Sequence, residues 1–320
     1  MTHVITPIKN LQFAKDIDEG LSSTPKKLSS KYFYDAKGDE LFQQIMAMEE
    51  YYPTDCEYEI LSTYRKNLLQ DFAGQRFDLI ELGAGDGTKT KVLLRHFLQE
   101  KADFRYVPID ISGNILAELK TALHEEMPTL EVSPVQGDYF KSLKQIPHVP
   151  DVRKVVLFMG GNIGNLDMNE ANVFLRVLAS HLHKGDLLMT GFDLKKDPQV
   201  ILDAYNDAKG ITAAFNLNLL YRINRELGAN FEIDQFQHWP TYNPLTGATK
   251  SYLVSATKQE VHIEALNKTY HFDAHEAIDM ELSQKYSLKD IEALAEKSGF
   301  QVRAHYTDDR RYFVDSLWEL

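Results

Sequence analysis

A glycine-rich segment restricts the fold of this chain more than any other part of its sequence. Residues 77–90, FDLIELGAGDGTKT, pass from an apolar stretch to three glycines at alternate positions. Gly83, Gly85 and Gly87 lack a Cβ atom, so the chain can turn tightly after a strand and a ligand can approach the main chain. A helix expected from about residue 87 to 99 would point its first N–H groups at the same place. The segment predicts a nucleotide-like ligand bound against the backbone, with an ordinary strand-to-helix turn as the alternative.

The spacing of the glycines and the charges beside them separate two classes of ligand. A dinucleotide fingerprint, G-x-G-x-x-G, would have its third glycine at position 88, where this chain has Thr88. Asp86 lies inside the loop, and Glu81 stands two residues before Gly83. Acidic groups disfavour a pyrophosphate and suit a sulfonium ion or ribose hydroxyls. The segment therefore predicts S-adenosylmethionine rather than NAD.

Composition and charge exclude several classes of protein. The 320 residues carry 35 Lys and Arg against 47 Asp and Glu, and this net charge of −12 disfavours nucleic acid and anionic membranes as partners. No segment reaches the roughly 18 apolar residues of a transmembrane helix, and no N-terminal targeting pattern is present. We expect a soluble, cytoplasmic monomer that acts on a small molecule. Cys56 is the only cysteine, so we expect neither a disulfide nor a bound metal.

Strand and helix patterns alternate after the glycine loop. We expect strands at 104–111, 132–139, 154–159 and 186–192, and helices at 114–126 and 169–183. Such alternation predicts a doubly wound parallel sheet with helices on both faces. The continuous apolar runs VVLF and DLLMTGF are typical of strands buried on both sides.

The alternation of strands and helices stops after Asp193 and resumes near the C-terminus. Residues 198–208 and 212–227 predict helices, FEIDQFQHWPTYNP a loop, and 251–255, 261–265 and 277–283 a small antiparallel sheet. A helix from Ser287 to about Gly299 and strands at 301–306 and 312–320 resume the doubly wound pattern. We therefore predict an α/β fold: a Rossmann-like, S-adenosylmethionine-binding domain of residues 58–195 plus 285–320, and a smaller α+β substrate domain. The substrate domain would combine the N-terminal segment 1–57 with an insertion, 196–284.

Polar side chains follow three of the predicted strands. Asp110 closes the second strand, where a carboxylate can bind ribose hydroxyls. Asp138 closes the third, and it can accept a hydrogen bond from an adenine amino group while Tyr139 stacks on the base. Either aspartate could instead be a helix N-cap. The fourth strand ends in GGNIGNL, where Asn165 offers an amide to a carboxylate.

Six segments spread over nearly the whole chain resemble the histidine N-α-methyltransferases of ergothioneine biosynthesis. They are KYFYDAKGDELF, YYPTDCE, ELGAGDGTKT, FMGGNIGNL, AYNDAKGITAAFNLNLLYRINRELGANF and MELSQKYS. The resemblance implies a class I methyltransferase sheet. It also implies transfer of methyl groups from S-adenosylmethionine to the α-amine of L-histidine, in three rounds, to give trimethylhistidine (hercynine).

The resemblance also implies roles for individual residues. Tyr34 matches a tyrosine near the methyl donor, and Tyr34 and Tyr51 are the candidate catalytic residues. The donor would be held by Gly83, Gly85, Lys89, Asp110, Asp138 and Tyr139 together with Tyr34. Histidine would be bound by Tyr51, Gly160, Asn165, Tyr205, Phe215, Glu281 and Ser283. In the family, the positions of Asn165 and Tyr205 take the substrate carboxylate, whereas those of Glu281 and Ser283 face the imidazole.

The chemistry of these residue types agrees with such roles. Neutral donors such as Asn165 and Tyr205 suit a carboxylate in an acidic protein. Glu281 can accept from an imidazole N–H, and Ser283 follows two residues later on the same strand face. An ordinary edge-strand pair is the alternative for this E-L-S triplet. The neutral amine would attack the sulfonium methyl in line, with Tyr34 or Tyr51 assisting loss of the amine proton through water.

One residue departs from the family pattern. Ser251 stands where family members carry a methionine at the side-chain end of the pocket. A smaller polar residue could enlarge the pocket, so a methyltransferase of the same fold acting on another amino acid or an indole amine is an alternative. A catalytically silent module that binds the nucleoside or amino acid is another.

Overall fold

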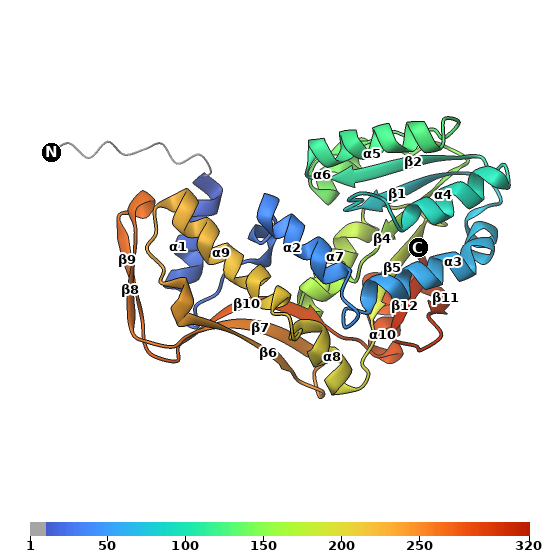
Figure 1. Cartoon of the computed structure of the whole chain (residues 1–320). Coiled ribbons are helices and arrows are strands. Elements are labelled where there is room, and N and C mark those ends of the chain that lie inside the picture. Colours follow the sequence, from blue (N-terminus) through green and yellow to red (C-terminus); the bar gives the residue numbers. More distant parts are fainter. Residues whose placement is uncertain (1–10) are drawn as a thin grey trace. The chain divides into compact units, whose positions relative to one another are not determined.

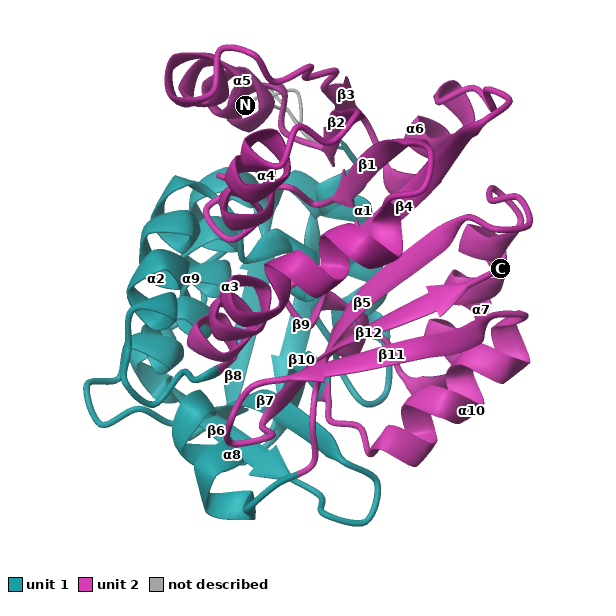
Figure 2. Ribbon diagram, turned by 90° about the vertical axis from the view of Figure 1, so that its right-hand side faces the viewer, with its two compact units in different colours: residues 1–52, 196–283 teal, residues 53–195, 284–320 magenta. Residues whose placement is uncertain are grey.

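The computed structural model describes residues 11–320, which form two compact units (Figures 1 and 2). Unit 1 combines the residues up to Tyr52 with Lys196–Ser283, and unit 2 combines Pro53–Lys195 with Gln284–Leu320. The boundary predicted after residue 57 lies within helix α3 (Pro53–Phe72), which unit 2 contains from its first residue. Residues 1–10, which the sequence assigns to the substrate domain, lie outside the described range.

Unit 2 is built on a seven-stranded sheet. Its strands are β1 (Arg76–Leu82), β2 (Phe104–Asp110), β3 (Val135–Gln136), β4 (Val152–Phe158), β5 (Leu187–Asp193), β11 (Gln301–Thr307) and β12 (Phe313–Glu319). The strand order is β11-β12-β5-β4-β1-β2-β3. Strands β1 to β5 pair in parallel, whereas β12 runs antiparallel to β5 and β11, so the sheet is mixed and not wholly parallel. Strand β1 lies between β2 and β4, at the switch in strand order where doubly wound sheets bind ligands.

Helices cover both faces of this sheet, as the sequence predicts. Besides α3 they are α4 (Thr90–Gln99), α5 (Gly113–Glu126), α6 (Tyr139–Gln145), α7 (Met168–Ala179) and α10 (Leu288–Ser298). Successive residues of one strand point to opposite faces. Leu79 and Val155 pack in the core with residues of α3, α4 and α5. Their neighbours Ile80 and Val156 pack in a second core with residues of α7 and α10.

Unit 1 has a helical layer and two small sheets around a separate core. Its elements are α1 (Leu11–Ser22), α2 (Ala36–Met46), α8 (Pro198–Tyr205), α9 (Ile211–Leu227), β6 (Phe236–Tyr242), β7 (Ala248–Ser255), β8 (Gln259–Ile263), β9 (Lys268–Phe272) and β10 (Ala277–Gln284). Three strands form a sheet in the order β10-β7-β6, and β8 and β9 form a hairpin. The predicted four-residue repeat of α9 is confirmed, since Phe215, Leu219, Ile223 and Leu227 are all buried in this core.

Two predictions about unit 1 were wrong. The segment expected to be a loop contains strand β6, which pairs with β7 over its whole length. Its Gln237 and Trp239 are exposed and Pro240 interrupts the pattern, so the segment lacked the apolar alternation of a strand. The region 261–265 belongs to the β8–β9 hairpin and not to the three-stranded sheet.

Several element boundaries in unit 2 also differ from prediction. Strand β3 is only two residues long, because Pro134 precedes it and Gly137, with φ +155°, follows it. Helix α4 begins at Thr90 and not at Gly87, whose φ of +66° is left-handed. The last helix is confirmed: Ser287 and Asp290 form a capping box and Gly299 is the left-handed C-cap.

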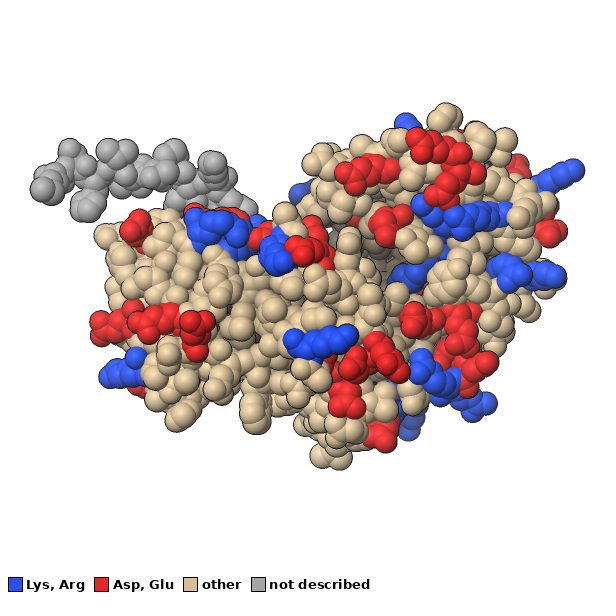
Figure 3. Space-filling view, viewed as in Figure 1, with Lys and Arg blue, Asp and Glu red and all other residues tan. Residues whose placement is uncertain are grey.

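The surface charges and the length of the helices are relevant to the predicted absence of nucleic-acid and membrane partners. Acidic and basic side chains are interspersed on the face shown in Figure 3. None of the helices within residues 11–320 is long and apolar enough to cross a membrane. The monomeric state and the cytoplasmic location stay predictions.

Candidate functional site

The glycine turn after β1 has one side open to a ligand. Gly83, Gly85 and Gly87 have φ values of +75°, +54° and +66°, a conformation that favours glycine. A Cβ added at Gly83 would lie 3.0 Å from Tyr139 Oη, and one at Gly87 would lie 2.8 Å from Leu119 Cδ1. No atom lies within 4 Å of a Cβ added at Gly85. The outer glycines thus permit packing against the protein, while the middle one leaves its backbone accessible.

The two predicted donor-site aspartates have different local roles. Asp110 accepts hydrogen bonds from Ser112 N at 2.9 Å and from Gly85 N at 3.3 Å, so it braces the glycine turn. Asp138 is the N-cap of α6 and accepts from Lys141 N at 3.0 Å. That hydrogen bond is the main cause of the lowered pKa of Asp138. The capping alternative therefore holds for Asp138 but not for Asp110, because α5 is capped by Ser112.

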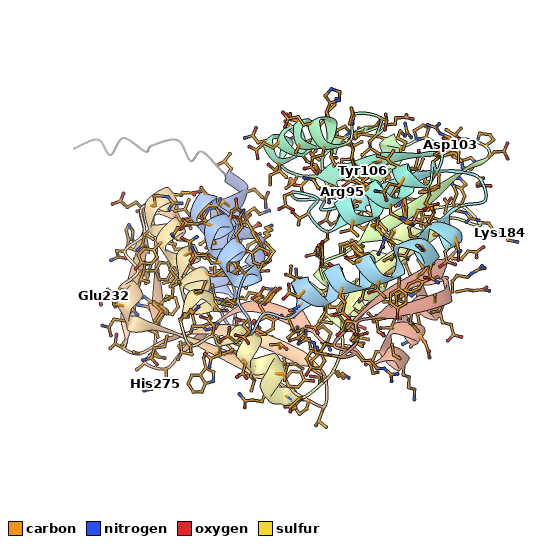
Figure 4. All side chains as sticks on the ribbon, turned by 45° about the vertical axis from the view of Figure 1, so that its right-hand side comes forward. Arg95, Asp103, Tyr106, Lys184, Glu232 and His275 are labelled. Carbon is orange, nitrogen blue, oxygen red and sulfur yellow. The ribbon has the colours of Figure 1, made fainter. Side chains whose placement is uncertain are left out.

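Carboxyl groups are buried directly beneath the turn. Glu81 accepts hydrogen bonds from Thr90 Oγ1 at 2.6 Å and from the Oη of Tyr106, a residue of β2 that is labelled in Figure 4. Burial raises the pKa of Glu81 to about 7, against the lowering effect of these two hydrogen bonds. Lys89, a predicted donor-binding residue, pairs through Nζ with the buried carboxylate of Glu57. The sequence analysis missed Glu57, although it lies in the YYPTDCE segment.

The loop after β4 provides the predicted substrate-binding residues of unit 2. Gly160 and Gly161 have φ values of +78° and +66° and lead into a 3-10 helix, Asn162–Asn165. Asn162 holds the turn by donating to Met159 O at 2.8 Å. Asn165 is exposed at the end of that helix.

Three predicted site residues of unit 1 gather in one aromatic cluster. The rings of Tyr34 and Phe215 are 5.6 Å apart, and both contact Phe42, at 5.5 and 5.8 Å. Phe42 also lies 6.5 Å from the ring of Tyr51. The Tyr34 side chain is 46% exposed, so part of its ring is accessible. Phe42, in the KYFYDAKGDELF segment, is a residue that the sequence analysis did not single out.

Polar contacts hold the Tyr34 turn on helix α9. Arg222 Nη1 donates to Tyr32 O at 3.0 Å, and Asn218 Nδ2 donates to Asp35 Oδ1 at 2.8 Å. Burial would raise the pKa of Asp35, but its hydrogen bonds, including one from Arg225, outweigh burial and lower it. The position of Tyr34 is thus set by a partly buried polar network as well as by packing.

A second group of predicted residues meets at strand β10. Tyr205 Oη donates to Ser283 Oγ at 2.8 Å, which joins the end of α8 to β10. Glu281 lies two residues earlier on the same strand and is partly buried. The resemblance assigns Tyr205 and Ser283 to opposite ends of the substrate, and here they are hydrogen-bonded to each other.

Ser251 is buried on the neighbouring strand β7. Only 1% of it is exposed, and its hydroxyl has no hydrogen-bond partner within the described part of the chain. It pairs with Pro240 of β6, which offers no N–H. A buried hydroxyl in such a position is costly unless water or a ligand satisfies it.

Within residues 11–320, no three His, Cys, Asp or Glu side chains are arranged to hold a metal ion. The single cysteine, Cys56, is buried and accepts from Arg310 Nη2 at 3.2 Å. Burial, the main cause, raises the pKa of its thiol to about 12.

Comparisons with known proteins agree with the geometry. The model of the family described as "Histidine-specific methyltransferase, SAM-dependent" matches residues 13–320. The histidine N-alpha-methyltransferase of Mycolicibacterium smegmatis is 37% identical over 303 residues, 95% of this chain and 93% of that protein. The protein of the same name from Mycobacterium tuberculosis is 37% identical over 309 residues, 96% and 95% of the two chains. Ergothioneine biosynthesis protein 1 of Schizosaccharomyces pombe is 30% identical, over 88% of this chain and 37% of that protein.

The sheet order of unit 2 and the glycine turn at the end of β1 define a Rossmann-like class I methyltransferase that uses S-adenosylmethionine. More narrowly, the chain belongs to the family of S-adenosylmethionine-dependent, histidine-specific methyltransferases. The resemblance carried by the six sequence segments is thereby confirmed.

The buried Glu81 predicts a pH dependence of stability. Its pKa rises from 4.5 to about 7 on folding, so the folded state binds this proton more tightly than the unfolded state does. The contribution of Glu81 to the free energy of unfolding is therefore complete below pH 4.5 and is lost as the pH rises through 7. The shift corresponds to about 3 kcal/mol. We expect the free energy of unfolding of wild type, relative to Glu81→Gln, to fall by roughly that amount between about pH 4.5 and 8. Urea titrations across this range measure it, with the exposed Glu118→Gln as control; parallel curves for wild type and Glu81→Gln would disprove the assignment.

Proposed function

We propose that this enzyme transfers methyl groups from S-adenosylmethionine to the α-amino group of L-histidine, in three rounds, to form trimethylhistidine (hercynine). This is the reaction expected in ergothioneine biosynthesis. The observation that carries the proposal is the Tyr205–Ser283 hydrogen bond beside Glu281, in a chain of the histidine-specific family. Glu281 and Ser283 offer the polar contacts that an imidazole requires, and Tyr205 fixes the Ser283 hydroxyl.

The residues of unit 2 fit the methyl donor. The accessible backbone at Gly85 permits close approach of a nucleoside, and Asp110 and Asp138 offer carboxylate oxygens to ribose hydroxyls and the adenine amino group. Tyr139 lies against Gly83 and presents its ring beside the turn. The Lys89 ammonium suits the carboxylate of the donor's amino-acid part. S-adenosylmethionine supplies an activated methyl group on a positively charged sulfur.

The acceptor residues divide by the part of histidine that they suit. Glu281 can accept from an imidazole N–H, and the Ser283 hydroxyl is fixed in position by Tyr205. Asn165, with Tyr205, is the proposed partner of the substrate carboxylate. Gly160 and Phe215 would line the pocket. None of these proposed acceptor residues carries a positive charge, so none of them would repel the protonated α-amine of histidine.

The aromatic cluster around the partly exposed Tyr34 suits a positively charged reaction centre. The α-amine of a peptide has a pKa of roughly 8, and amines of this kind are largely protonated at neutral pH, so a proton must leave before attack. Tyr34 and Tyr51 can attract the cationic groups through their ring faces and can pass the proton to water. The cluster with Phe42 and Phe215 fixes these rings, so the protein contributes alignment of the reacting groups.

Glu281→Gln tests the role of the carboxylate. Removing a charged hydrogen-bond acceptor for the imidazole should lower kcat/KM for histidine roughly 10- to 100-fold. Affinity for S-adenosylhomocysteine should stay at the wild-type value, because Glu281 is not proposed to contact the donor. Exposed Glu260→Gln on β8 is the matched control. Equal kcat/KM for histidine in wild type and Glu281→Gln would remove the proposed imidazole contact.

Ser251 favours a second candidate, a methyltransferase of the same fold that prefers a larger amine such as tryptophan. Filling its buried position with the longer methionine side chain should reduce space at the side-chain end of the pocket. We expect Ser251→Met to raise the ratio of kcat/KM for histidine over tryptophan by about 10-fold. Ser251→Ala removes the unpaired hydroxyl without filling space and serves as control. Wild type that methylates tryptophan better than histidine would establish the second candidate instead.

A further inference from the structure

A single buried carboxylate lies at the meeting point of three elements of unit 2. Glu57 is on the first part of helix α3, and none of its side-chain surface is exposed. One oxygen, Oε2, pairs with Lys89 Nζ just before helix α4. The other, Oε1, accepts from Gly160 N at 2.7 Å, on the loop after β4. Glu57 therefore contacts a proposed donor-binding residue and a proposed substrate-binding loop at once.

Strand β5 of the sheet leaves room for the Glu57 carboxylate. Gly191 of β5 has no side chain, and an added Cβ would lie 2.5 Å from Glu57 Oε1 and 3.0 Å from the ring of Phe313. Such a distance is too short for any real Cβ, so even alanine at Gly191 would displace Glu57 or Phe313. The space above β5 is thus occupied by a charged group from a helix 134 positions earlier in the sequence (191 − 57 = 134).

A second carboxyl group is buried beside Glu57. Asp315 of β12 is fully buried beside Glu57, and neither of its oxygens receives a hydrogen bond from the described residues. Burial first, and the negative charge of Glu57 second, raise the pKa of Asp315 well above its usual value. A protonated Asp315 can donate to Glu57, since two carboxylates cannot bond to each other without a proton. Glu57 is then the single anion that pairs with the Lys89 cation.

Both contacts of Glu57 fix groups that face the proposed ligands. Burial would lower the pKa of Lys89, but the charge and hydrogen bond of Glu57 outweigh burial and raise it, so the ammonium stays charged. The hydrogen bond to Gly160 N orients the peptide group that begins the left-handed Gly160–Gly161 turn and the helix ending at Asn165. One carboxylate thus determines the placement of a cation and of a backbone turn.

We propose that Glu57 is a positioning residue that couples the donor and acceptor sites: it directs the Lys89 ammonium toward the methyl donor and holds the Gly160–Asn165 loop in its binding conformation. The inference rests on the proposed function, because that function assigns Lys89 to the donor and Asn165 to histidine. A glutamine at this position keeps the shape but has one acceptor oxygen in place of two. If that oxygen turns toward Lys89, an N–H₂ group opposes Gly160 N, and if it stays on Gly160 N, the N–H₂ group faces Lys89. In either case the cation loses its counter-ion.

Ligand binding and kinetics of Glu57→Gln test the proposal. We expect the Kd of S-adenosylhomocysteine, measured by calorimetry, to rise roughly 10- to 100-fold, since one partner of a buried charge pair is lost. The KM for histidine should also rise, with a smaller change in kcat. Asp55→Asn makes the same carboxylate-to-amide change on the exposed side of the same turn and should bind and react as wild type does.

A double mutant separates positioning from general damage. If Glu57 acts on the donor through Lys89, then Lys89→Met and Lys89→Met/Glu57→Gln should bind S-adenosylhomocysteine equally weakly, within about twofold. The double mutant should show the same KM for histidine as Lys89→Met alone, because without the cation the amide oxygen of the substituted glutamine stays on Gly160 N. The double mutant also removes both charges together, so it remains informative if Glu57→Gln alone does not fold.

The possible outcomes distinguish failure of the proposed role of Glu57 from failure of the proposed function. Wild type that binds no S-adenosylhomocysteine or leaves histidine unmethylated would overturn the proposed function. Folded Glu57→Gln with wild-type Kd and KM would overturn only the role of Glu57. A further loss of S-adenosylhomocysteine affinity on adding Glu57→Gln to Lys89→Met would show that Glu57 does not act through Lys89, and would also overturn it.

Discussion

The pairing of buried charge at the carboxyl edge of the seven-stranded sheet is the interaction on which unit 2 depends most. Glu57 and Lys89 form an ion pair there, and Glu81 and Asp315 are buried next to it. Burying an isolated charge costs several kcal/mol, so every one of these groups needs a partner or a proton. These groups lie among residues of helices α3 and α4, the loop after β4, and strands β5 and β12. The glycine turn proposed to bind the donor lies close to two of these groups in the chain, since Glu81 precedes Gly83 by two residues and Lys89 follows Gly87 by two.

Each unit carries residues with a different kind of chemistry. Unit 2 supplies accessible backbone, carboxylates and one cation, which suit a charged nucleoside. Unit 1 supplies an aromatic cluster, which suits a cationic centre. It also supplies Ser283 of β10, which Tyr205 of α8 fixes and which suits an imidazole. Ser251 departs from the family pattern, and its buried hydroxyl lacks a hydrogen-bond partner within the described residues. It is therefore the position from which substrate preference is most open to change.

Local patterns were enough to predict much of this fold. The apolar runs of β4 and β5, the repeat of α9 and the Ser287 cap each depend on neighbouring residues, and all were predicted. Strand β6 was missed because its exposed Gln237 and Trp239 hide the pattern of a strand. Glu57 was missed because its partners Lys89 and Gly160 are 32 and 103 residues away. Contacts at such separations follow from the folded sheet and leave no local signal in the sequence.

The position of the transferred methyl groups tests the central claim most directly. Wild-type enzyme would be incubated with histidine and S-adenosylmethionine carrying an isotopically labelled methyl group, and the product analysed by mass spectrometry and NMR. The account predicts that all label is on the α-nitrogen and that the final product carries three methyl groups. Label on an imidazole nitrogen, or histidine recovered without label while the donor is bound, would contradict it.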